Sequence, residues 1–245
     1  AQDEWSVLEN LKLTAGFRVD LFSFTKKPLE NPQFAAPHNW YGMDAGSVLN
    51  TSVIPNPISY SPRVGFNWDV NNDKQIQLRG GVGLFSGRTP GVWISNQFSS
   101  TGVDVLRIDE RNTQYTFTPD VNNQPKPDNP KAQTTEINIT DPNLKMPQIL
   151  RGNLGFDYQL PLGFVLTLEA LYGKTIYDIE YQNINLQYAK NDDGTIATTI
   201  DGRNLYSKER VDKSFTRVIY MKNTTQGNQL NLVAQIQKPY GQGIL

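Results

Sequence analysis

Residues 11–21 read Leu-Lys-Leu-Thr-Ala-Gly-Phe-Arg-Val-Asp-Leu, so every odd position is apolar and, apart from Gly16, every even position is polar. An amphipathic helix repeats its apolar residues about every 3.6 positions, whereas a strand places successive side chains on opposite faces. The stretch therefore predicts a β-strand over 11–21 with one apolar and one polar face.

The same alternation returns in later stretches, at residues 62–70, 75–85, 150–160, 164–173 and 230–236, with Val165, Leu171 and Val233 as exceptions. No stretch of comparable length carries the apolar stripe of an amphipathic helix. The chain is therefore predicted to be all-β.

Short connections alternate with very long ones along the predicted strands. The polar residues 71–74 and the sequence Pro161-Leu162-Gly163 are typical of tight turns, so they predict antiparallel hairpins. Connections longer than about 12–15 residues usually carry function, and here they cover 25–59, 86–148 and 175–225. Inside them we expect an irregular segment at 119–130 and outward hairpin tips at 191–194 and 201–202.

Strand length separates two all-β architectures. Strands of globular proteins average about five to six residues, whereas tilted membrane strands need about 9–11. The predicted strands reach the membrane length, and aromatic residues near their ends are typical of interfacial girdles: Phe22, Phe24, Trp68, Tyr158 and Phe164. We therefore favour an antiparallel transmembrane β-barrel over a soluble β-sandwich, in which two apolar faces would pack together.

Composition excludes several classes of protein. The 245 residues carry a net charge of −1, which disfavours nucleic-acid binding driven by counterion release. The chain has no Cys and one His, so thiolate nucleophiles, cysteine metal sites and multi-histidine metal sites are excluded. Mean hydropathy is −0.50, and no apolar run reaches the ~18 residues of a membrane helix.

Enzymatic chemistry finds little support in the sequence. His38 has no nucleophile motif beside it, and the acidic pairs Asp109-Glu110 and Asp192-Asp193 lie in predicted loops. Residues 80–83 (Gly-Gly-Val-Gly) lie inside a predicted strand with no predicted helix after it, unlike a phosphate-binding loop. We expect no catalytic residue, metal or cofactor, and a plain turn rather than a calcium site at 191–194.

One segment resembles a known family. Residues 79–98, Arg-Gly-Gly-Val-Gly-Leu-Phe-Ser-Gly-Arg followed by Thr-Pro-Gly-Val-Trp-Ile-Ser-Asn-Gln-Phe, resemble the barrel of Oar-like TonB-dependent outer-membrane transporters. Residues 61–69 resemble the strand before it, and 201–203 with 230–236 fit later parts of that barrel. The resemblance implies that residues 1–245 are a partial barrel domain: about six to seven strands of a barrel of about 22, with long extracellular loops.

The resemblance also implies a location and partners. The location is the Gram-negative outer membrane. The partners are membrane lipid, a plug domain of the same protein outside this chain, a periplasmic energy-coupling protein and an unidentified substrate, with no nucleic acid. No plug, coupling segment or terminal strand with a final aromatic residue is recognisable, and both ends read as cut. We therefore expect an internal piece of a longer protein.

Six residues are candidates for ligand or lumen contacts: Arg63, Arg79, Arg88, Trp93, Asn96 and Arg151. The arginines could meet plug carboxylates or substrate, or belong to a solvated polar face. Trp93 and Asn96, in a predicted loop, could contact ligand or pin that loop against the barrel wall. The glycines of 80–83 could admit a plug or another backbone, or mark a bend.

The predicted function is that of a transporter or receptor that binds substrate with external loops and admits it through a plugged barrel. Two alternatives remain open at this point. One is a soluble or surface β-sandwich that binds a glycan or a protein. The other is an outer-membrane barrel that serves as a scaffold in a larger surface assembly.

Overall fold

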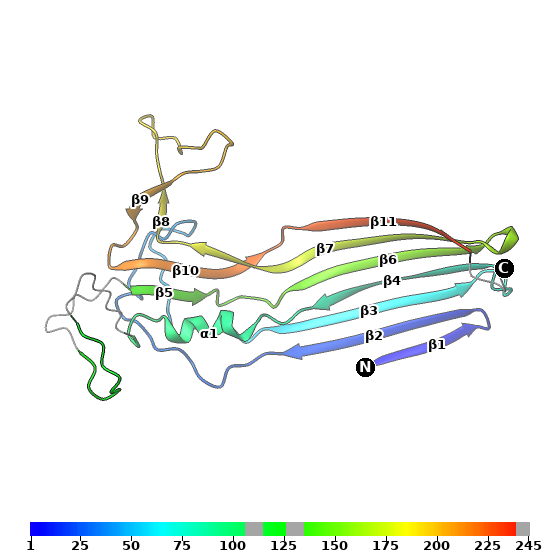
Figure 1. The fold of residues 1–245 in the computed structure, drawn as a ribbon, viewed down its shortest axis with the longest axis horizontal. Coiled ribbons are helices and arrows are strands. Elements are labelled where there is room, and N and C mark those ends of the chain that lie inside the picture. Colours follow the sequence, from blue (N-terminus) through cyan, green and yellow to red (C-terminus); the bar gives the residue numbers. More distant parts are fainter. Residues whose placement is uncertain (106–114, 126–134, 239–245) are drawn as a thin grey trace.

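A computed structural model describes residues 1–105, 115–125 and 135–238. Among these residues, nine strands form one sheet in the order β1-β2-β3-β4-β6-β7-β10-β5, with β11 also paired to β7 (Figure 1). The strands of this sheet are β1 (Gln2–Leu8), β2 (Leu11–Leu21), β3 (Ile58–Asp69), β4 (Ile76–Ser86), β5 (Thr135–Thr140), β6 (Gln148–Gln159), β7 (Val165–Asn183), β10 (Phe215–Thr224) and β11 (Asn228–Gln237). The other elements are β8 (Leu186–Tyr188), β9 (Tyr206–Arg210), the helix α1 (Gly91–Ser99) and a 3-10 turn at Pro161–Gly163.

Antiparallel neighbours β1, β2, β3, β4, β6, the first part of β7, and β11 run along the length of the molecule (Figure 1). We call these strands the long sheet. Its register keeps the two faces apart, since apolar residues pair with apolar ones, as Leu13 does with Phe66, and polar-face residues with polar-face ones. Within the described ranges β1 and β11 pair on one side only, so the sheet is open.

The apolar face of the long sheet is exposed. Val64 keeps 56% of its surface, Leu154 54% and Leu230 64%. No second sheet packs against this face in the part of the chain that the structure describes. The β-sandwich alternative is therefore wrong, because its apolar faces would be buried against each other.

The predicted strands are confirmed. Strand β2 has the predicted bounds, and most of the other strands differ by a few residues, although β7 runs ten residues past its predicted end at 173. Short turns close the hairpins with left-handed residues, at Asn72 (φ 59°) and Lys74 (φ 61°) after β3 and at Leu162 (φ 66°) after β6. Strand β1 was not predicted, because its first residues are polar on both faces.

The long connections fold together at the opposite end of the molecule from these turns (Figure 1). There β10 pairs with β7 over Asp178–Asn183, and β5 adds to β10 in parallel. We call the described residues between 22 and 57, 87 and 147, and 175 and 227 the loop layer. Two of its hairpin tips turn at Gly194 and Gly202, as expected, and the arm that carries them projects outward (Figure 1).

Helix α1 corrects the prediction of a loop at 91–99. It spans nine residues and buries Ile94 and Gln97, one turn apart. Such a short helix leaves too few periodic positions to stand out in sequence. No helix among the described residues has the length and apolar character needed to cross a membrane. Residues 119–125 lack helix and strand, as expected, while 126–130 lie outside the described residues.

Every buried hydrophobic side chain in the described residues lies in the loop layer, and none in the long sheet. They form two clusters: Phe34, Trp40, Ile137, Ile139, Ile184, Phe215, Val218 and Tyr220 in the first, and Ile94, Leu144, Met146 and Met221 in the second. Phe22 and Phe24 are partly buried against the second cluster, so they help to cover the loop layer, and the girdle expected for them stays a prediction.

Candidate functional site

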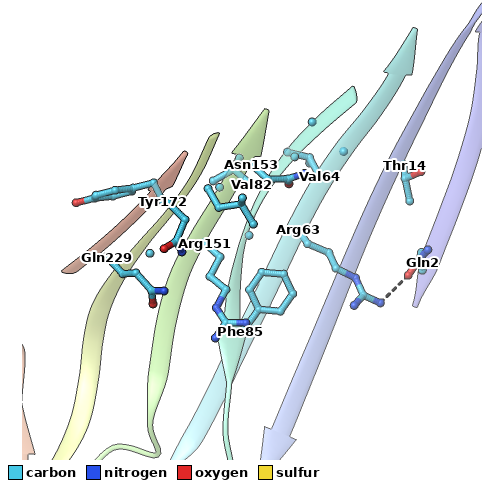
Figure 2. A pocket seen from close by; sticks show the side chains of 18 residues that line it. Gln2, Thr14, Arg63, Val64, Val82, Phe85, Arg151, Asn153, Tyr172 and Gln229 are labelled. Atoms are coloured by element: carbon cyan, nitrogen blue, oxygen red, sulfur yellow. Dashed lines mark hydrogen bonds between the residues drawn. The ribbon is translucent and has the colours of Figure 1, made fainter. Parts of the chain in front are cut away.

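Glycine and arginine alternate in one row across the polar face of the long sheet. The row of paired residues runs Gln2, Gly16, Arg63, Gly83, Arg151, Gly173 and Gln229. Gly65 and Gly81 pair in the neighbouring row. Because these glycines carry no side chains, the face is hollowed here, and the hollow measures about 690 Å³ (Figure 2).

The approach of strand β3 explains two of these glycines. A Cβ atom on Gly83 would lie 2.7 Å from the Cβ of Arg63, and one on Gly81 would lie 2.8 Å from the carbonyl oxygen of Val64. Any side chain would force the strands apart at these positions. The close approach of another backbone is therefore confirmed, and a contact with a plug stays a prediction.

Three cations of the polar face are neutralised by carboxylates. Nε of Arg79 donates to Asp157 at 3.0 Å, and its guanidinium also pairs with Glu169. The other two pairs are Lys12 with Glu4 at 3.1 Å and Arg18 with Asp20 at 2.7 Å. Arg79 therefore has two carboxylate partners within the long sheet.

Arg63 and Arg151 differ from these three. Arg63 donates to the neutral side chain of Gln2 at 2.5 Å, and Arg151 has no hydrogen bond or ion pair to any described residue. Figure 2 shows their side chains on either side of the Phe85 ring, at the hollow. Two unbalanced positive charges thus border one depression.

The remaining three candidates lie elsewhere, in the loop layer. The guanidinium carbon of Arg88 is 6.0 Å from the centre of the Phe22 ring. Trp93, on α1, meets Tyr181 edge to face, with ring centres 5.8 Å apart. Trp93 therefore holds α1 against the end of β7, while Asn96 is exposed on the same helix.

Sequence reasoning missed several residues of the hollow: Gln2, Phe85, Asn153, Gln229 and Asn231. Gln2 was missed because β1 was not predicted. The others depend on which strands pair and in what register, and this information is not local. The repeated glycine two residues apart, Gly81 and Gly83, and the candidates Arg63 and Arg151 were the signals in the sequence that marked the place.

His38 joins two parts of the loop layer. Its Nε2 lies 2.9 Å from Oδ2 of Asp212, its Nδ1 lies 2.6 Å from the carbonyl oxygen of Ala36, and its ring stacks on Trp40 at 4.3 Å. A carbonyl only accepts, so Nδ1 carries a hydrogen. Burial acts to raise the pKa of Asp212, but hydrogen bonds from Ser214 and His38 outweigh it and lower that pKa below its ordinary value. These contacts give His38 a structural role, and we call the pair of His38 and Asp212 the clasp.

Metal ligands do not gather in the described residues: no group of three His, Asp or Glu side chains is placed to hold an ion. Asp193 accepts hydrogen bonds from the backbone and hydroxyl of Thr195, which is how an acidic residue stabilises a turn. Asp109 and Glu110 lie outside the described residues.

Comparison with protein families gives one match, which covers the chain: the model described as outer membrane beta barrel domain matches residues 1–245. The chain belongs to this family. The outer-membrane barrel predicted from the sequence is thereby confirmed, as is its location in the Gram-negative outer membrane. The apolar face of this barrel domain therefore meets lipid and the polar face meets the barrel interior. Neither a curated protein nor a solved structure matches the chain.

Proposed function

We propose that this barrel domain belongs to a TonB-dependent transporter, a receptor that binds substrate with its external loops and admits it through a plugged lumen. The observation that carries the proposal is the glycine-lined hollow, a recess in the interior wall that is bordered by Arg63 and Arg151. The resemblance of residues 79–98 to such transporters supports it.

The loop layer supports a role in binding, because buried polar side chains brace its backbone. Asn185 is fully buried, donates to the carbonyl oxygens of Asp212 and Phe215 and accepts from the Asp212 N–H. Gln97 donates to the carbonyl oxygens of Thr51 and Val53, at 2.7 Å each. Loops that are ordered before binding lose less entropy when a ligand arrives.

The proposal assigns no catalytic step and no cofactor to this chain. Its partners are membrane lipid, a plug domain of the same protein, a periplasmic energy-coupling protein and a substrate that the polar wall and the loops recognise. The scaffold alternative needs the same wall and loops but no passage of solute.

Uptake in living cells tests the proposal. Cells with and without the whole protein would be offered radiolabelled ferric siderophores, oligosaccharides and peptides, and the experiment would be repeated without the energy-coupling protein. We expect uptake of one class to require both proteins. Uptake that is unchanged for all three classes, together with loss of a surface assembly, would favour the scaffold.

A further inference from the structure

We propose that the hollow is an anion-binding site, which receives a carboxylate or phosphate group between Arg63 and Arg151. This inference goes beyond the proposed function, because neither membership of the barrel family nor energy-coupled transport requires a charged site at this place. It rests on the charges of the polar face, on the register of its strands and on the shape of the hollow.

The cations of the polar face differ in whether a carboxylate lies beside them. The three other cations of the polar face, Lys12, Arg18 and Arg79, each have a carboxylate partner. Arg63 and Arg151 have none among the described residues, and both border the hollow. Guanidinium groups without a carboxylate partner create a concentrated positive field in a recess with low-dielectric walls.

The register sets the distance between the two arginines. Arg63 and Arg151 both pair with Gly83, from opposite sides of β4. Neighbouring strands lie about 4.8 Å apart, so the two backbones are separated by about 10 Å. Gly83 places no side chain between them in that row, but the Phe85 ring of the next row lies between the two arginine side chains (Figure 2).

In the structure Arg63 lies over Gly16 and points to Gln2, away from Arg151 (Figure 2). It must therefore leave the hydrogen bond to Gln2 to share an anion with Arg151. A guanidinium fork matches the oxygens of a carboxylate or a phosphate, and both side chains are long enough to turn towards a shared anion.

The rim of the hollow suits a polar molecule around that anion. Asn153, Gln229 and Asn231 supply amide donors and acceptors from β6 and β11. None of them carries a negative charge, so no lining side chain competes for the arginines. An anionic solute in the barrel and an acidic side chain from another part of the same protein would bind by the same chemistry.

Arginine labelling tests the site without knowledge of the natural ligand. The whole protein, purified from outer membranes in detergent, would be treated with phenylglyoxal, and the labelling rate of each arginine would be followed by mass spectrometry. The probes are citrate and inorganic phosphate, compared with chloride at equal ionic strength. Arg18 is exposed and paired with Asp20, so its rate should be the same in every buffer.

A solute site predicts that Arg63 and Arg151 react readily in chloride and are protected by the probes. By mass action, about 20 mM of a probe that binds at about 10 mM slows labelling about threefold. An internal carboxylate predicts instead slow labelling of both arginines in every buffer. In that case the double variant Arg63→Gln with Arg151→Gln should lower the melting temperature of the barrel.

Two glycine variants serve as a matched pair. At Gly173 and Gly152 an added Cβ would meet its nearest atom at 3.4 Å and 3.7 Å, so both positions tolerate a side chain. Gly173 lies in the row of Arg151. Gly152 also borders the hollow through its backbone, but it pairs with Val82 and Tyr172 in an apolar-face row, so an added side chain would lie on the face opposite the arginines. Gly173→Val should remove the threefold protection by citrate, or raise the slow labelling rate if a carboxylate fills the site, and Gly152→Val should do neither.

Two results would overturn the anion site. One is ready labelling of both arginines that neither citrate nor phosphate slows. The other is slow labelling in every buffer with an unchanged melting temperature in the double variant, since the arginines would then be shielded without being bound. Both readouts use purified protein, so they are independent of the uptake that tests transport.

Discussion

The long sheet and the loop layer place their apolar side chains in opposite ways. The loop layer buries its apolar side chains in two clusters, as a water-soluble domain does, with Trp40 only 1% exposed. The long sheet buries no apolar side chain in the described residues and turns residues such as Leu154 outward. The difference shows that one chain is built for two solvents, because lipid replaces the protein core as the surroundings of the apolar face.

The largest effect is expected in the core of the loop layer. Trp40→Ala should destabilise that layer by about 3–5 kcal/mol, because it leaves a cavity beside Phe34, whose ring centre is 5.4 Å away. Protease cleavage of the loops on intact cells would measure the loss. Insertion of the barrel should not change.

Trp40→Phe is the control for this prediction. The buried indole Nε1 has no hydrogen-bond partner among the described residues, so its removal leaves no polar group unpaired. The loops should then stay resistant. If Trp40→Ala prevented insertion, the two regions would not be separate folding units.

A charge on the lipid-facing side is expected to have the next largest effect. Leu154 is 54% exposed on the apolar face, near the middle of β6. Leu154→Arg should cost about 2–4 kcal/mol, because the guanidinium must enter hydrocarbon. Refolding into lipid vesicles over a urea series would measure it.

The neighbouring variant Asn153→Arg is the matched control, since the side chain of Asn153 lies on the polar face, in the row of Gly81. Folding should tolerate this second charge. Equal losses from the two variants would contradict the assignment of the faces.

A smaller effect is expected when the buried Asn185, whose side chain holds the backbone of the loop layer, is replaced. Asn185→Ala removes the acceptor of the Asp212 N–H and one of the two donors to the Phe215 carbonyl oxygen, which should cost about 1–3 kcal/mol. Hydrogen exchange of the backbone at 211–215 should become faster. The exposed Asn191, changed to Ala, should leave that exchange as it was.

The smallest effect is expected from the pH dependence of the clasp between His38 and Asp212. The folded pKa of Asp212 is lowered, so its stabilisation is present above the unfolded value of about 3.9 and is lost as the pH falls through the folded pKa. The contribution should be at most about 1 kcal/mol. An acid titration of tryptophan fluorescence would follow it, and Asp212→Asn should remove the transition. A transition that persisted in Asp212→Asn would assign the pH dependence to another group.

The comparison also explains which parts of the fold were predictable. Strand β2 was predicted to its bounds because lipid and water impose a strict alternation on it. Strand β10 was missed because several residues in a row, from Val218 to Met221, are wholly or partly buried, and such a run has no alternation. Helix α1 was missed for another reason: its nine residues bury only one short face, which is too short a pattern to show a helical period.

The site was predictable in part. Arg63 and Arg151 were candidates from the sequence, because arginine on the polar face of a barrel strand stands in its interior. Arg79 was an equal candidate, and only the pairing of β4 with β6, and of β6 with β7, brought Asp157 and Glu169 to it. The sequence therefore predicted the polar wall but not which of its charges are left unbalanced.

The sequence by itself determined the strands of the long sheet other than β1, their two faces and the short turns after β3 and β6. These are local properties, since a period of two residues is complete within any short segment. Only the tertiary structure decided the row in which glycine and arginine alternate, the hollow at that row and the core of the loop layer. Those depend on strand register and on contacts between residues far apart in the chain, which no local pattern encodes.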